Sequence, residues 1–171
     1  VLMTFIPAFP THPPETSWMR VPSTDVPGLI LNHPAGGGRV AFLPADLDRR
    51  FGRDNLPDHG NLLASLVRWA AKDDIPLEVE GAGLIDCHVY HQPGRLILHL
   101  VNLTSAGTWR QPVHELIPIG PLQVKIKLPA DVRGARARQL VADGAVTARV
   151  AAGVSGFEVK SILDHEVIVI E

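Results

Sequence analysis

The chain has 171 residues, 46% of them hydrophobic, which is enough apolar material for one domain or for two small ones. Its 16 basic and 18 acidic residues leave a net charge of −2, without the basic excess that binds nucleic acid. No apolar run approaches the roughly 20 residues of a membrane span. The single cysteine excludes an internal disulfide and a multi-cysteine zinc site. We therefore expect no nucleic-acid or membrane partner and, since residues 1–9 lack signal-peptide features, a cytoplasmic protein.

The first 43 residues predict three short strands. Val1–Ile6 is apolar on both sides and predicts a buried strand, whereas Gly28–Asn32 and Arg39–Leu43 are joined by the glycine-rich turn HPAGGG and predict a hairpin. Between the first and second of these strands lies Phe9–Arg20, FPTHPPETSWMR. Its prolines remove backbone donors and restrict the preceding residues. This segment predicts an ordered, extended loop.

A charged loop and one amphipathic helix follow. Asp46–Asp58 is dense in aspartate and arginine and predicts a loop. Pro57 and Asp58 then favour a helix start, and the helical spacing of apolar residues predicts one apolar face. That face consists of Leu62, Leu63, Leu66 and Val67. We expect it to be buried against the strand residues Val40–Leu43, and we expect the helix to end before Ile75-Pro76.

The remainder of the chain predicts only strands. Leu122–Leu128 alternates apolar and polar residues, as in a half-buried antiparallel strand, and Pro93-Gly94 and Asp143-Gly144 indicate tight turns. Ser105–Pro121 predicts a long loop. Eight short strands at this spacing indicate a sandwich or barrel. The expected strands are Leu77–Glu80, Leu84–Tyr90, Arg95–Val101, Leu122–Leu128, Arg136–Val141, Ala145–Val150, Phe157–Lys160 and Glu166–Ile170.

Few residue patterns point to chemistry. The carboxylates of the Asp46–Asp58 loop could act as acid and base or hold a metal, but ion pairing with the loop's own arginines and helix capping also explain them. No histidine has a metal-ligand spacing, and no nucleophile elbow, P-loop or dinucleotide-binding motif occurs. His88 and His99 fall on neighbouring predicted strands, where they could meet across a sheet. We expect no catalytic residue, no metal and no cofactor.

Six residues are candidates for a ligand or interdomain contact. Trp18 could stack on a sugar or pack on a partner, and the prolines around it pre-organise its loop. Arg49 and Arg50 could contact a neighbouring domain or an acidic ligand. The full set is His12, Glu15, Trp18, Arg49, Arg50 and Trp109.

Four segments carry a family resemblance. They read FPTHPPETSWMR, GRVAFLPADLDRRFGRDNLPDHGNLLASLVRWA, RLILHLVNLTSAGTWRQPVHELIPIGP and ILDHEVIVIE. Together they resemble the C-terminal part of large bacterial glycoside hydrolases, which are similar to β-galactosidases with a trimerisation domain. The resemblance implies a catalytic (β/α)8 barrel, then a domain similar to class I glutamine amidotransferases without their chemistry, then a small β-sandwich. Residues 1–74 would be the tail of the α/β amidotransferase-like layer, and residues 75–171 the antiparallel sandwich.

This resemblance predicts a non-catalytic accessory segment, because the barrel lies outside these 171 residues. The segment would support oligomerisation and domain packing, with the rest of the parent chain or identical subunits as partners and a carbohydrate as a further candidate ligand. Two alternatives stay open. One is a stand-alone carbohydrate-binding module using Trp18, Tyr90 and Trp109, against which the scarcity of aromatic residues weighs. The other is a small hydrolase using Asp46, Asp48 and His59.

The beginning of the sequence suggests a piece of a longer protein. No initiator methionine is present, and strand-like sequence starts at once with Val1–Ile6. A trimmed but complete protein is the alternative. On the first interpretation the apolar segment Val1–Phe9 is the expected contact with a partner.

Overall fold

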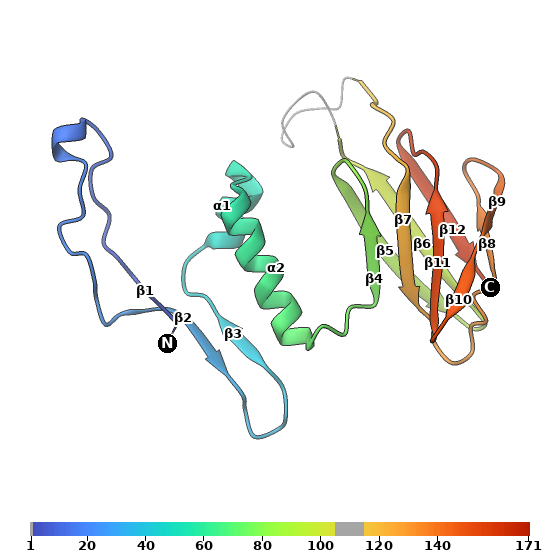
Figure 1. Cartoon of the computed structure of the whole chain (residues 1–171), viewed down its shortest axis with the longest axis horizontal. Helices are drawn as coiled ribbons and strands as arrows, with labels where there is room; N and C mark the ends of the chain where they lie inside the picture. The colour runs from blue at the N-terminus through green and yellow to red at the C-terminus, as the bar shows by residue number, and fades with distance from the viewer. Residues whose placement is uncertain (1, 105–114) are drawn as a thin grey trace. The chain divides into compact units, whose positions relative to one another are not determined.

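The computed structural model describes residues 2–104 and 115–171 (Figure 1). The chain divides into two compact units, an N-terminal unit, Val1–Ile75, and a C-terminal unit, Pro76–Glu171. Most regular structure in the described residues is antiparallel β-sheet, and the two α-helices both belong to the N-terminal unit. The chain is therefore β-rich, as expected for its second part.

The N-terminal unit contains a three-stranded antiparallel sheet in the order β1-β2-β3. Its strands are β1 (Met3–Thr4), β2 (Pro27–Asn32) and β3 (Val40–Phe42). The predicted hairpin is confirmed, since Ile30 pairs with Phe42 and Asn32 with Val40. Gly37 adopts a φ of 86° in its turn, a conformation that glycine tolerates without strain.

The predicted buried strand at Val1–Ile6 is wrong. Only Met3 and Thr4 form a strand, and both are exposed. Leu2 and Phe5, on either side, are 68% and 52% exposed. The apolar sequence predicted burial, but β1 has one neighbouring strand, and no described element covers it.

The predicted loop Asp46–Asp58 is also wrong, because it contains the helix α1 (Leu47–Asp54). Arg50 and Asp54 are four residues apart and form an ion pair of 3.2 Å along the helix. Asp48 in the first turn and Arg53 in the last turn interact favourably with the helix dipole. Asn55, in the left-handed conformation, ends the helix. The apolar stripe of this helix consists of only two residues, Leu47 and Phe51, which is a weak signal in a sequence.

The second helix, α2 (Pro57–Ala71), begins with Pro57 in its first turn as predicted. Its expected buried face is wrong, however. Leu62, Leu63 and Leu66 are only half-buried, and Val67 is 62% exposed. Among the described residues of the N-terminal unit, Leu29 is the only one that is buried. This unit therefore has almost no core of its own.

The C-terminal unit is formed by two antiparallel sheets, seen as two layers in Figure 1. One sheet has the order β10-β11-β7-β4 and the other β5-β6-β12-β8-β9. The described residues of this unit contain no helix. The strands are β4 (Leu77–Glu80), β5 (Ile85–Gln92), β6 (Arg95–Asn102), β7 (Leu122–Lys127), β8 (Arg136–Gln139), β9 (Gly144–Thr147), β10 (Arg149–Ala151), β11 (Val154–Val159) and β12 (His165–Ile170).

The core between the two sheets follows the two-residue period of the strands. Leu122, Val124 and Ile126 of β7 are at most 1% exposed, which confirms the alternation predicted for that strand. The five-stranded sheet supplies the opposite side of the core with Leu96, Leu98, Leu100, Ile168 and Ile170.

Three sequence-based expectations of pairing are confirmed. The Pro93-Gly94 turn joins β5 to β6, and Gln92 pairs with Arg95 directly before and after it. Asp143-Gly144 lies in the β8–β9 hairpin. His88 pairs with His99 across β5 and β6.

The expected strand Ala145–Val150 is wrong as a single element. It is two strands in different sheets, because β9 pairs with β8 and β10 pairs with β11. The chain crosses from one sheet to the other at Ala148. The apolar–polar alternation continues across this point, so periodicity alone cannot show the change of sheet.

Candidate functional site

The predicted contact residues His12, Glu15 and Trp18 are exposed residues of the proline-rich loop. The loop is not fully extended, since Pro14–Thr16 forms a 3₁₀ turn, and the Thr16 hydroxyl donates to the Pro13 carbonyl at 3.1 Å. Trp18 is 56% exposed, but the Arg20 guanidinium lies 3.7 Å from the centre of its ring. One face of the indole is therefore covered by the chain itself, which leaves the other for a partner.

Two further predicted contact residues, Arg49 and Arg50, lie on α1. Arg49 pairs with Asp46 at 3.2 Å, and Arg50 pairs with Asp54 at the same distance. A hydrogen bond from Arg53 lowers the pKa of the Asp54 carboxyl. Ion pairing along the helix therefore accounts for these charges.

The hydrolase alternative involves three residues, at the N-cap of α1, in α1 and in α2. No hydrogen bond links Asp46, Asp48 and His59 to one another in the described part of the chain. Nor do the described residues hold any group of three or more metal-ligating side chains. Trp109 lies outside the described residues.

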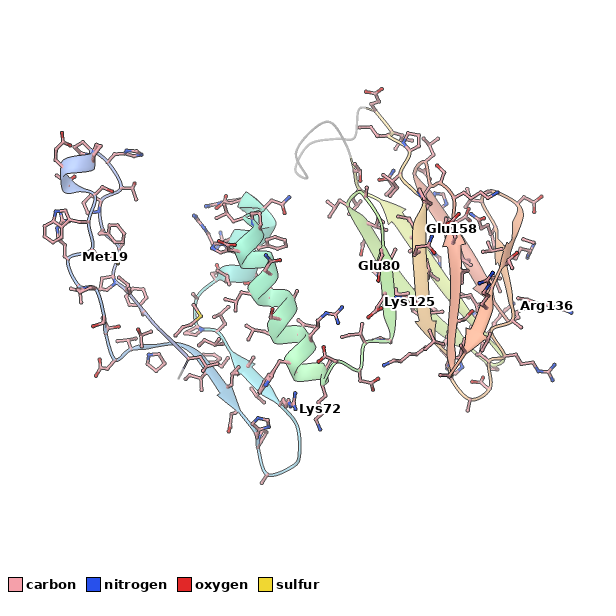
Figure 2. All side chains as sticks on the ribbon, viewed as in Figure 1. Met19, Lys72, Glu80, Lys125, Arg136 and Glu158 are labelled. Atoms are coloured by element: carbon pink, nitrogen blue, oxygen red, sulfur yellow. The ribbon has the colours of Figure 1, made fainter. Side chains whose placement is uncertain are left out.

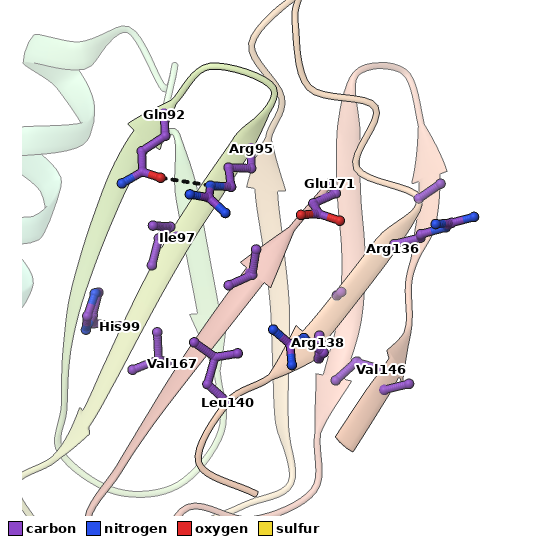
Figure 3. A pocket seen from close by; sticks show the side chains of 14 residues that line it. Gln92, Arg95, Ile97, His99, Arg136, Arg138, Leu140, Val146, Val167 and Glu171 are labelled. Atoms are coloured by element: carbon purple, nitrogen blue, oxygen red, sulfur yellow. Dashed lines mark hydrogen bonds between the residues drawn. The ribbon is translucent and has the colours of Figure 1, made fainter. Parts of the chain in front are cut away.

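A groove of about 760 Å³ lies on the outer face of the five-stranded sheet (Figure 3). Residues of β6 and β12 that alternate with the core residues form its floor, because successive side chains of a strand point to opposite faces. Ile97, Val167 and Val169 are these floor residues, and all three are half-buried. Ala145 is the register partner of Arg138, and its small side chain leaves space beside the floor.

The rim of this groove is polar and mainly basic. Arg95 donates from Nε to the Gln92 side-chain oxygen at 2.8 Å, which orients its guanidinium. Neither Arg95 nor Arg138 has a carboxylate partner among the described residues. Figure 3 shows the Glu171 carboxylate at the rim between Arg95 and Arg136, and it is the one carboxylate among the lining residues.

An aromatic pair lies beside the groove. His99 lines it, and Tyr90 of β5 contacts His99 edge-on with ring centroids 5.4 Å apart. Tyr90, one of the aromatic residues proposed for sugar stacking, is 56% exposed and contacts a residue that lines this groove.

Sequence reasoning missed the groove. The available signal was that β6 and β12 are apolar at both inward and outward positions, for example Leu98 beside Ile97 and Ile168 beside Val167. A strand that is apolar on both faces indicates an outer face with something to bind or to pack on.

The fold resembles part of a solved glycosidase. The chain superposes on alpha-L-fucosidase isoenzyme 2 from Paenibacillus thiaminolyticus with a TM-score of 0.67 and 18% identity, over 91% of this chain and 24% of that chain. A cycloisomaltooligosaccharide glucanotransferase from Paenibacillus sp., complexed with cycloisomaltoheptaose, gives a TM-score of 0.46 and 12% identity, over 57% of this chain and 17% of that chain. The second likeness is too weak to carry an argument, whereas the first shows a shared fold. This chain thus spans about a quarter of the length of the fucosidase chain.

No protein-family profile and no curated protein match the sequence. In the described parts of the chain, neither helix has the length and hydropathy needed to cross a membrane.

Proposed function

We propose that the chain is a non-catalytic accessory segment of a larger, glycoside hydrolase-like protein. The observation that carries the proposal is the likeness to the fucosidase, which covers 91% of this chain but 24% of the other. Nearly all of this sequence thus has the fold of one part of a much longer chain.

The N-terminal unit is, on this proposal, the part that packs on the rest of the parent chain or on an identical subunit. Its apolar residues support this role, because a domain of its own would bury them. Leu29 is its one buried residue among those described, and α2 buries none. The exposed large apolar residues are Leu2, Met3, Phe5, Phe9, Trp18, Met19, Val21, Val26, Val40, Phe42, Leu56 and Val67.

The finer assignment follows the family resemblance. Residues 1–74 would belong to an amidotransferase-like domain of the kind that trimerises β-galactosidases, and would contribute to oligomerisation. The proline-rich loop with His12, Glu15 and Trp18 would lie at such a contact, as would Arg49 and Arg50 on α1. The C-terminal sandwich has a complete core and would fold as an accessory domain.

Two observations test this proposal. The gene should encode further protein immediately before Val1, and an in-frame start codon at that position would contradict an accessory segment. The purified chain should not turn over aryl-glycoside substrates. Turnover that is abolished by Asp46→Asn or Asp48→Asn would favour the hydrolase alternative instead.

The groove on the five-stranded sheet favours a second candidate function, carbohydrate binding. It combines an apolar floor with polar side chains at the rim, which is the usual composition of a small-ligand site.

A further inference from the structure

We propose that the groove on the outer face of the five-stranded sheet binds a short anionic saccharide, with carboxylate or sulfate groups placed against Arg95 and Arg138. The choice of a saccharide rests on the proposed function, and the choice of an anion rests on the groove itself. The size of the groove, about 760 Å³, suits a ligand of a few sugar units. A protein partner would instead need a broad contact surface.

One cation on the outer face of the four-stranded sheet has carboxylate partners, whereas two arginines beside the groove have none among the described residues. On the four-stranded sheet, Lys125 lies 3.3 Å from Glu80 and 3.6 Å from Glu78, so its charge is matched within the domain (Figure 2). On the five-stranded sheet, Arg95 and Arg138 have no such partner among the described residues. Two unpaired guanidinium groups beside one groove favour an anionic occupant, because the planar donor fork of arginine fits carboxylate and sulfate oxygens.

The floor of the groove suits the apolar face of a sugar ring. Ile97, Val167 and Val169 present adjacent aliphatic side chains from two paired strands, with Val169 opposite Ile97 in register. His99 and Gln92 add hydrogen-bonding groups at the margin. The C–H groups of a pyranose ring could lie on this floor while its anionic substituent reaches an arginine.

Glu171 gives the proposal a sharper form. Its carboxylate lies at the rim between Arg95 and Arg136 in Figure 3, where it would repel an anion bound by Arg95. Replacing it by glutamine should therefore strengthen binding, whereas a ligand without charge would be indifferent to this change.

The test is isothermal titration calorimetry of the whole chain with three probes at low salt. The probes are trigalacturonic acid, a sulfated galactose trisaccharide and the neutral galactotriose. We expect one or both anionic probes to bind, and the neutral one to bind at least about tenfold more weakly. Arg95→Ala and Arg138→Ala should each weaken anion binding about tenfold, since hydrogen bonds to charged groups are of that strength. Glu171→Gln should strengthen it.

Arg149→Ala is the matched control, because Arg149 is an exposed arginine on β10 of the other sheet. Thermal unfolding of each variant tests whether the fold is intact. Three results would each overturn the proposal: no binding of either anion, equal binding of the neutral probe, or an equal loss with Arg149→Ala. Tighter binding of an acidic peptide through the same arginines would also overturn it, in favour of a protein partner.

Failure of the groove assignment can be distinguished from failure of the proposed function. An absence of saccharide binding, together with an open reading frame before Val1 and no glycosidase activity, would refute only the groove assignment. Saccharide binding by a chain whose gene starts at Val1 would refute the accessory role and retain the groove.

Discussion

Glu166, which is 2% exposed, accepts a hydrogen bond from the backbone N–H of Val141 at 2.9 Å. The same carboxylate accepts from the backbone of Ala142 and Val167 and from the Gln139 amide. It thereby joins β12 to the turn of the β8–β9 hairpin, which supplies Arg138 and Ala145 to the groove. A charged side chain is stable at this depth because its oxygens are saturated with donors.

Glu166→Ala should destabilise the chain by about 2 kcal/mol, because it leaves several donors near the turn without an acceptor. Urea unfolding followed by circular dichroism measures this difference. Glu158→Ala, at an exposed site on β11 with one side-chain partner, is the control and should change stability by less than about 1 kcal/mol. Equal effects of both substitutions would show that the Glu166 hydrogen bonds do not hold the hairpin.

Leu98→Ala should cost about 2–5 kcal/mol, because Leu98 is fully buried in the core of the sandwich. Leu66→Ala should cost distinctly less in the isolated chain, about 1 kcal/mol, because Leu66 is only half-buried. Denaturant unfolding, followed separately in each unit, measures both changes in the free energy of unfolding. A larger loss from Leu66→Ala would mean that α2 packs against a core that its exposure does not reveal.

Asp131 should make part of the sandwich's stability dependent on pH. The backbone N–H of Gly94 lowers the pKa of its carboxyl below the ordinary 3.8, and His91, 3.0 Å away, lowers it further. A group with a depressed folded-state pKa stabilises the fold above its unfolded pKa, and this contribution is lost as the pH falls through the folded value. Between about pH 5 and pH 2, the free energy of unfolding of the wild type should therefore fall more than that of Asp131→Asn. Parallel pH profiles would contradict this role.

The N-terminal unit should make the isolated chain self-associate at micromolar concentrations. Phe5 is 52% exposed and follows β1, the edge strand of its sheet, so Phe5→Asp should reduce association without unfolding the sandwich. Leu163→Asp, at a 54% exposed site of the C-terminal unit, is the control and should leave association unchanged. Sedimentation equilibrium distinguishes the variants. A monomeric wild type at high micromolar concentration would argue against an uncovered contact surface.

The sequence predicted the sandwich better than the N-terminal unit, for a physical reason. Buried residues such as Leu122 and Val124 alternate with exposed Gln123 and Lys125, because both sides of that core lie within the chain. Apolar residues such as Phe5 and Val67 also predict burial, but no described residues bury them. They are therefore exposed in the structure. The sequence shows that an apolar residue is stabilised by burial, but it does not show which element covers that residue.

Charge-based features were harder to predict. The helix α1 is short and mostly charged, with ion pairs such as Arg50–Asp54 and only two apolar residues to indicate a helical period. The groove depends on which residues face outward on strands that are far apart in sequence, such as Arg95 on β6 and Arg138 on β8. Those two residues come together through the strand order β6-β12-β8, which the sequence does not state.

Hydrogen exchange measured by mass spectrometry tests the central claim most directly. The 171-residue chain is compared with a longer protein that includes the sequence encoded before Val1. If the N-terminal unit packs on the rest of its parent, amides of β1 and α2 should exchange at least about tenfold more slowly in the longer protein. Amides of β6, β7 and β12 should be protected equally in both, since the sandwich core is already complete. Unchanged exchange of β1 and α2 in the longer protein would contradict the account.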